Sequence, residues 1–196
     1  MIKKFTYALA VSDRSCHLHD GYEWISYGNL AMARSGSTAT VRNGTELLIF
    51  GGRNYEDDPI AAMTSTESIH FKTRTIGDAG FKIPVLSKHQ CVAAVNVSRL
   101  YIQHGRNAYL LDLDLNRWGS VPQPEVWREG HVCGFVRHSE EIVVVGGSGD
   151  PSVEIFSLKE GGSPIQTWYK GPFTNDVRRE GEGGGCPNSD AVREVA

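Results

Sequence analysis

The feature that most constrains this chain is a short apolar run that ends in glycine and recurs along the sequence. It reads ELLIFGG at Glu46–Gly52 and EIVVVGG at Glu141–Gly147, with a weaker copy, LYIQHG, at Leu100–Gly105. An apolar run of this length, rich in β-branched residues and ended by glycine, is typical of a strand buried on both faces. Glycine at its end allows positive φ and the close approach of a neighbouring backbone. The recurrence predicts a repeat protein.

The surroundings of the three runs repeat as well. Between an arginine and the following glycines, the sequence predicts two short strands with a turn, of which Asn43-Gly44 is the clearest, because both central residues of such a turn favour positive φ. A third strand follows the glycines and a fourth carries a tryptophan. Four antiparallel strands in a period of about 40 to 50 residues predict a blade of a β-propeller. Three of the four tryptophans mark this repeat, and each precedes an arginine by ten positions, in the pairs Trp24 and Arg34, Trp118 and Arg128, and Trp168 and Arg178.

Together these features resemble kelch repeats. The best unit is LDLDLNRW at Leu111–Trp118, where Leu111 takes the place that the family usually gives to tyrosine. Two positions depart from the pattern: Phe81 is the nearest substitute for the tryptophan missing from the second unit, and His104 replaces the first glycine of the third. The resemblance covers residues 14–180 and implies an all-β, kelch-type propeller. The structural repeat residues that it assigns are Trp24, Arg34, Gly51, Gly52, Gly105, Trp118, Arg128, Gly146, Gly147 and Trp168.

The repeats divide the chain into about three complete blades and a partial one. We expect a partial first blade at 1–30, blades at 31–87, 88–120 and 121–172, and a disordered tail or the start of a truncated blade at 173–196. We read Met1–Val11 as an inner strand, with a secretory signal as the alternative. Because propellers usually close with at least four blades, we expect an arc that is a fragment, an incomplete product, or closed by self-association.

Composition and motifs exclude several classes of function. The net charge of −3 argues against nucleic acid, and no apolar run approaches the roughly 18 residues of a membrane span. The hydrolase, zinc-peptidase and nucleotide-binding motifs are absent from the sequence. Some proteins with kelch-type propellers are copper oxidases, but no spacing selects a ligand set here. We therefore expect neither enzyme activity nor a cofactor; the residues considered were His17, His19, Tyr22, Tyr101, His104 and Tyr109.

The loops after the glycine runs are the candidate binding residues. Arg53, Asn54 and Tyr55 follow the first run, and Arg106 and Asn107 follow the second. Arginine offers a planar set of donors that suits a carboxylate. We expect a non-catalytic module that binds a partner protein or an acidic peptide, as kelch-type adaptors and scaffolds do. One alternative is a solvated loop without a partner, in which Glu56-Asp57-Asp58 satisfy Arg53. The other is a fragment of a secreted kelch-type copper oxidase or extracellular scaffold.

Two structural roles complete the prediction. Arg34 and Arg128 are expected to bridge adjacent blades, because their distance from tryptophan is fixed. The tryptophans themselves are expected to be core residues that close one blade against the next.

Cysteines and asparagines bear on the compartment. Cys91 and Cys133 fall at matching places on the innermost strands of adjacent blades, each two residues after a histidine. Plain packing is the favoured interpretation, with a disulfide or a metal site as alternatives. Asn43 and Asn96 match the N-glycosylation pattern, and both lie in predicted turns. We expect a cytoplasmic protein, with secretion as the alternative.

Overall fold

The computed structural model describes residues 8–12, 14–19, 22–54, 64–84, 89–148, 151–159 and 168–171. These residues form fifteen strands and, within those ranges, no helix. None of their elements therefore provides a helix that is long and apolar enough to cross a membrane. The predicted tail at 173–196 lies outside the described residues.

The strands form four antiparallel sheets, one of three strands and three of four, and each sheet keeps the order of the chain. Blade 1 contains β1 (Ala8–Ser12), β2 (Ser15–His19) and β3 (Trp24–Asn29). Blade 2 contains β4 (Thr38–Arg42), β5 (Glu46–Phe50), β6 (Ser65–His70) and β7 (Thr75–Lys82). Blade 3 contains β8 (Cys91–Ala94), β9 (Arg99–His104), β10 (Asn107–Asp112) and β11 (Arg117–Ser120). Blade 4 contains β12 (Val132–Val136), β13 (Glu141–Val145), β14 (Val153–Ser157) and β15 (Trp168–Lys170).

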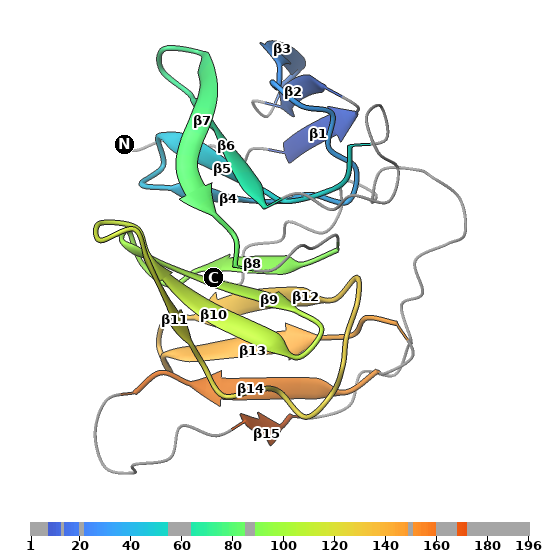
Figure 1. Ribbon diagram of the computed structural model, residues 1–196, viewed down its shortest axis with the longest axis vertical. Coiled ribbons are helices and arrows are strands. Elements are labelled where there is room, and N and C mark those ends of the chain that lie inside the picture. The colour runs from blue at the N-terminus through green and yellow to red at the C-terminus, as the bar shows by residue number, and fades with distance from the viewer. Residues whose placement is uncertain are drawn as a thin grey trace.

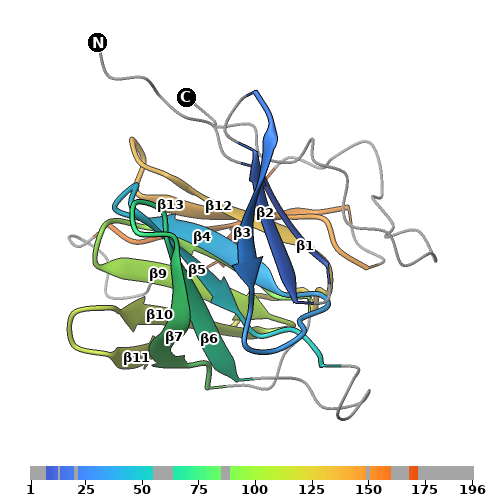
Figure 2. The same cartoon turned by 90° about the horizontal axis from the view of Figure 1, so that it is seen from above.

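The chain is therefore an all-β propeller arc, as its periodicity predicted. Blades 1 and 2 lie at one end of the long axis and blade 4 at the other (Figure 1). Seen from above, the strands of blade 2 lie over those of the later blades (Figure 2). Each sheet falls within one of the expected units, 1–30, 31–87, 88–120 and 121–172.

Local sequence accounts for the first hairpin of blade 2. Asn43 and Gly44 have φ of 54° and 65°, the positive values that the two central residues of such a turn favour, and Thr45 N closes the turn by donating to the Arg42 carbonyl. The turn sets the register, in which Arg42 faces Glu46 across the strands. Their side chains form an ion pair of 2.6 Å at the surface. The Asn-Gly turn is thus present where the sequence predicted it.

Three apolar clusters fill the spaces between successive blades. In β9, side chains alternate between the two faces of the sheet, because successive residues of a strand point to opposite sides. Leu100 and Ile102 pack toward blade 2, whereas Tyr101 packs toward blade 4. The cluster between blades 2 and 3 also contains Phe81, which is 7% exposed and lies on the fourth strand of its blade, where blades 3 and 4 carry tryptophan.

The tryptophans differ in burial, which corrects part of the prediction. Trp168 closes blade 4 against blade 3, since its ring lies 5.2 Å from that of Phe156 and 6.3 Å from that of Tyr101. Trp118 is partly buried against the cluster between blades 2 and 3. Trp24 is 48% exposed and belongs to none of the three clusters. The expectation of a core role is wrong for Trp24, whose ring contacts His19 of its own blade, 5.2 Å away, instead of a neighbouring blade.

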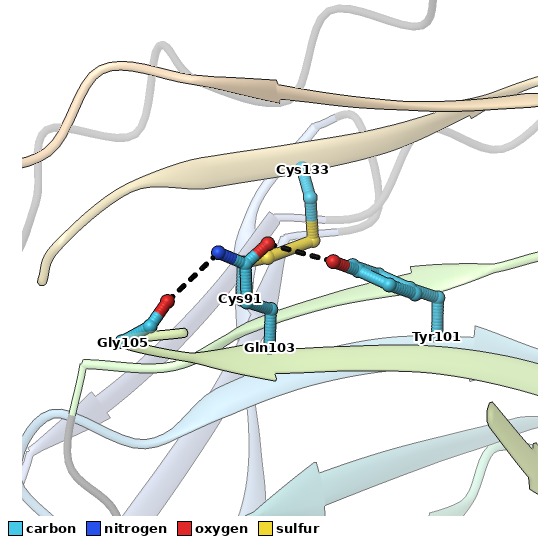
Figure 3. Close-up of a disulfide and its surroundings, with 5 residues drawn as sticks. All are labelled: Cys91, Tyr101, Gln103, Gly105 and Cys133. Carbon is cyan, nitrogen blue, oxygen red and sulfur yellow. Dashed lines mark hydrogen bonds between the residues drawn. A yellow bond between two sulfur atoms is a disulfide. The ribbon is translucent and has the colours of Figure 1, made fainter. Parts of the chain in front are cut away.

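A disulfide joins Cys91 and Cys133, which corrects the interpretation that they only pack. The two Cα atoms lie 5.6 Å apart, within the range that a disulfide spans. Cys91 lies on β8 and Cys133 on β12, so the bond links the innermost strands of blades 3 and 4. Beside it, Tyr101 donates a hydrogen bond to Gln103 Oε1, and Gln103 Nε2 donates to the carbonyl of Gly105 (Figure 3).

Candidate interaction face

A buried arginine holds the linker before blade 2 against that blade. Arg34 Nε donates to Glu67 Oε1 at 2.8 Å, and its Nη1 donates to the carbonyl of Gly51 at 2.7 Å. Its Nη2 donates to Ser65 Oγ at 2.9 Å. The other carboxylate oxygen, Glu67 Oε2, accepts from the backbone nitrogen of Ala31. The guanidinium therefore fixes both the linker and the glycine loop after β5.

The same network recurs at the linker before blade 4. Arg128 Nε donates to Glu154 Oε2 at 3.1 Å, Nη1 to the carbonyl of Gly146 at 2.6 Å, and Nη2 to Ser152 Oγ at 2.6 Å. Glu154 Oε1 accepts from the backbone nitrogen of Glu125 at 2.7 Å. Arg128 therefore bridges blades 3 and 4: its backbone carbonyl accepts a hydrogen bond from the Gly105 nitrogen of blade 3, while its side chain binds blade 4. The side-chain bonds of Arg34, by contrast, all reach the blade that follows it.

Sequence reasoning found the two arginines and missed their carboxylate partners. Arg34 and Arg128 are at most 2% exposed, and Glu67 and Glu154 at most 4%. A buried ion pair is stable only when both charges are paired and hydrogen bonded, as they are here. The pattern Ser-x-Glu at the start of the third strand, shared by the second and fourth blades, is the signal that could have revealed them.

The second glycine of each doublet lets a loop lie directly against a linker. Gly52 and Gly147 have φ of 96° and 101°, a region that residues with a side chain rarely adopt. A Cβ on Gly52 would lie 3.1 Å from the Ser35 carbonyl oxygen, and one on Gly147 would lie 3.0 Å from that of Glu129. The second glycine of each doublet is thus required by this close approach of backbones.

Backbone hydrogen bonds then join the loops and linkers into one rim. Ser35 and Arg53 exchange two bonds, of 2.9 and 2.8 Å. In the middle, His89 donates to the Gly36 carbonyl and accepts from Gly130 through its backbone. At the far end, the loop after β13 joins the same linker, since Ser148 donates to the Glu129 carbonyl at 2.8 Å. The loops after β5, β9 and β13 are therefore held at one end of the blades.

The predicted contact residues are not equally available on this rim. Arg106 and Asn107 are exposed: Arg106 lies in the two-residue turn Gly105-Arg106, and Asn107 is the first residue of β10. Arg53 is partly exposed, but its Nε atom is buried and has no hydrogen-bond partner among the described residues. Asn54 is only 7% exposed, so it has little surface to offer a partner. Tyr55 lies outside the described residues.

An exposed tryptophan that sequence reasoning did not select lies against Gly105, the residue before Arg106. Trp127 is 52% exposed, and its Nε1 lies 2.7 Å from the position that a Cβ on Gly105 would occupy. The residue before Arg34 in the equivalent linker is Ala33, which is buried, so this aromatic ring is particular to one linker. We call Arg53, Arg106, Asn107 and Trp127 the loop face.

An open hollow begins at the same place. Its volume is about 310 Å³, and it extends from Asn107 along the ends of β10 and β11. Its walls mix apolar and polar side chains, and its lining residues are Asn107, Ala108, Tyr109, Ser120, Val121, Pro122 and Gln123. The hollow gives the loop face a concave part next to its arginine.

A buried histidine lies behind the rim. His131 is 5% exposed, and neither ring nitrogen has a hydrogen-bond partner among the described residues. Burial, followed by the positive charge of Arg128 and by His104, lowers the pKa of His131 to about 4. The ring is therefore neutral at pH 7. Across the described ranges, no three His, Cys, Asp or Glu side chains are grouped so that they could hold a metal ion.

Comparison with known proteins supports the fold. No family model matches this chain, and no curated protein is similar to it in sequence. Solved structures do match: one of them, the structure of YjhT, superposes with a TM-score of 0.70 at 11% sequence identity, over 87% of this chain. The chain spans 65% of the length of that protein. The likeness agrees with the propeller arrangement and concerns the fold alone.

Proposed function

We propose that this chain is a non-catalytic protein-interaction module that binds an acidic segment of a partner protein on the loop face. The observation that carries the proposal is that two exposed side chains, Arg106 and Trp127, meet at the Gly105 turn: Arg106 follows Gly105 in the chain, and Trp127, from the linker before blade 4, lies against Gly105. Arginine and tryptophan are the residue types that most often dominate the binding energy of protein interfaces.

The charges of the rim favour an acidic partner. Arg34 and Arg128 are neutralised by buried carboxylates, as described above, so they add no free positive charge to the surface. Arg53 and Arg106 have no ion pair among the described residues and can meet a carboxylate of the partner. The rigid backbone of the rim lowers the entropy lost on binding, because loops that are already ordered need not be fixed by the partner.

The kelch-type assignment is part of this proposal. It is supported by the glycine doublets and by the two matching arginine networks, which give the repeat residues a common structural purpose. Self-association that closes the ring is also proposed, since closure removes the exposed ends of an arc. Light scattering of the purified chain measures the mass and tests this part by itself.

The binding proposal is tested with fluorescently labelled peptides rich in Asp and Glu. Each peptide has a matched copy in which Asn and Gln replace the acidic residues, and fluorescence anisotropy gives the dissociation constant. We expect the acidic peptides to bind more tightly than their neutral copies and to weaken as salt increases. Arg106→Ala and Trp127→Ala should each raise the dissociation constant about tenfold, which corresponds to about 1.4 kcal/mol.

Arg99 provides the matched control. It is exposed and is the first residue of β9, whereas the turn that contains Arg106 follows the last residue of the same strand. Arg99→Ala therefore removes the same charge from the same blade without touching the loop face, and should leave binding unchanged. Equal binding of acidic and neutral peptides, or equal weakening by Arg99→Ala and Arg106→Ala, would contradict the proposal.

A further inference from the structure

The end of the blades opposite to the loop face carries two exposed glycosylation sequences. Asn43-Gly-Thr45 forms the turn between β4 and β5, and Asn96-Val-Ser98 forms the turn between β8 and β9. Each turn joins the first two strands of its blade, whereas the loop face is built from the connections between the second and third strands and from the linker before blade 4. The two sequences therefore lie at the same edge of neighbouring blades.

The turn at Asn43 leaves its acceptor groups open to solvent. Asn43 and Thr45 are both exposed. The hydrogen bonds that hold the turn are made by backbone atoms, from Thr45 to Arg42 and from Phe71 to Thr45. The side-chain amide of Asn43 and the hydroxyl of Thr45 are therefore not needed for the structure of the hairpin.

The turn at Asn96 presents its amide in a defined orientation. Asn96 Oδ1 accepts a hydrogen bond of 2.8 Å from the backbone nitrogen of Ser98. This bond uses the amide oxygen and leaves Nδ2, the atom that carries an N-linked glycan, free to react. Val97, between the two, is 62% exposed, so the middle of the sequence also faces solvent.

The disulfide supplies an independent observation about the compartment. Disulfides between structural cysteines form and persist in oxidising compartments and are rare in the cytosol, where thiols are kept reduced. The Cys91–Cys133 bond lies on the same strand β8 that leads into the Asn96 turn. The chain thus combines a feature of secreted proteins in its interior with acceptor sequences on its surface.

We propose that Asn43 and Asn96 are N-glycosylated in the secretory pathway. The donor is an oligosaccharide linked to a lipid through pyrophosphate. Nδ2 of the asparagine forms a bond to C1 of the first sugar, the bond from C1 to the pyrophosphate oxygen breaks, and the amide loses one proton. The lipid pyrophosphate is the leaving group, and nothing is oxidised or reduced.

Glycans at these positions are compatible with partner binding. They extend from the edge opposite to the loop face, so neither covers Arg106 or Trp127. The equivalent turn of blade 4, at His138-Ser-Glu140, has no acceptor asparagine and stays unmodified. The modification would make one end of the arc hydrophilic and leave the other end free.

The first measurement uses protein isolated from its natural source. Peptide mass spectrometry before and after treatment with an N-glycosidase shows whether each asparagine has become aspartate, which marks a former glycan. We expect conversion at Asn43 and Asn96. The same digest without reductant should contain the peptides of Cys91 and Cys133 joined to each other. An unmodified asparagine at either position overturns the assignment of that site, and free thiols at both cysteines overturn the inference about the compartment.

The second measurement uses the full chain behind a cleavable secretion signal in a eukaryotic cell. Thr45→Ala and Ser98→Ala should each remove one step of glycosidase-sensitive mobility on a gel, whereas Thr45→Ser and Ser98→Thr should keep it. These variants leave both asparagines in place, so the turn at Asn43 keeps its residue of positive φ. A secreted, disulfide-bonded chain without glycosidase-sensitive steps would show that the turns are not acceptors.

Discussion

Reduction of the Cys91–Cys133 bond should destabilise the propeller arc strongly. The two cysteines are 42 residues apart in sequence and join the innermost strands of blades 3 and 4. Reduction frees the unfolded chain from a long closed loop, and it leaves the contacts of the folded chain nearly unchanged. The same loss is made permanent by the double variant Cys91→Ala/Cys133→Ala.

The magnitude follows from the length of the loop. Closing a loop of this size lowers the entropy of the unfolded chain by about 13 cal/mol/K, which is about 4 kcal/mol of stability at 25 °C. In a chain of this size, each kcal/mol shifts the melting temperature by roughly 2 to 4 °C. We therefore expect the reduced chain to melt about 8 to 16 °C below the oxidised one.

The assay is thermal and urea unfolding, followed by circular dichroism with and without a reductant. The double variant is the control, because it should unfold like the reduced chain and should not respond to the reductant. Cys16 should not interfere: burial, followed by the charge of Glu67, raises the pKa of its thiol to about 11, so it stays protonated. Equal unfolding midpoints for the oxidised and reduced chains would refute the reasoning. So would alkylation of Cys91 and Cys133 in folded protein to which no reductant has been added.

Two further predictions concern the charged groups behind the loop face. Arg128→Met should lower the free energy of unfolding by about 3 to 5 kcal/mol in urea titrations, because it leaves the buried carboxylate of Glu154 without its charge partner. The double variant Arg128→Met/Glu154→Gln should recover part of this loss. A single variant as stable as the native chain would contradict the network. The pKa of His131 is lowered to about 4 from an ordinary 6.5, so between pH 6.5 and pH 4 the unfolded chain binds more protons at this residue than the folded chain does. The free energy of unfolding should therefore fall by up to about 3 kcal/mol as the pH falls through this range. Urea titrations at several pH values should show that His131→Gln removes this part of the pH dependence, and an unchanged slope would exclude His131 as its source.

The blades could be predicted because their signals are local. Glycine doublets, the Asn43-Gly44 turn and the spacing from tryptophan to arginine each lie within a few tens of residues, and strand and turn preferences depend on such neighbours. Phe81 could likewise be named as the substitute for a missing tryptophan, since the repeat fixes which position must fill the space between blades. The exposure of Trp24 could not, because burial depends on what packs against its strand.

The sequence predicted which loops form the loop face, but it did not predict which side chains are exposed there. The glycine runs indicate which loops meet, so Arg53 and Arg106 were found. The burial of Asn54 and the exposure of Trp127 depend on how linkers from other repeats lie against these loops. The carboxylates that neutralise the arginines lie 33 and 26 residues away in sequence, a distance over which no local rule pairs side chains.

The sequence by itself determined the architecture, because a repeated pattern of strands and turns allows few ways to bury its apolar residues. The tertiary structure alone decided the state of Cys91 and Cys133, which the sequence favoured as packed thiols. A disulfide requires two Cα atoms within a narrow distance, and only the docking of blade 4 against blade 3 brings these two to 5.6 Å. Strand and turn preferences depend on residues that are near one another in the sequence, whereas the contacts between blades depend on how the blades pack.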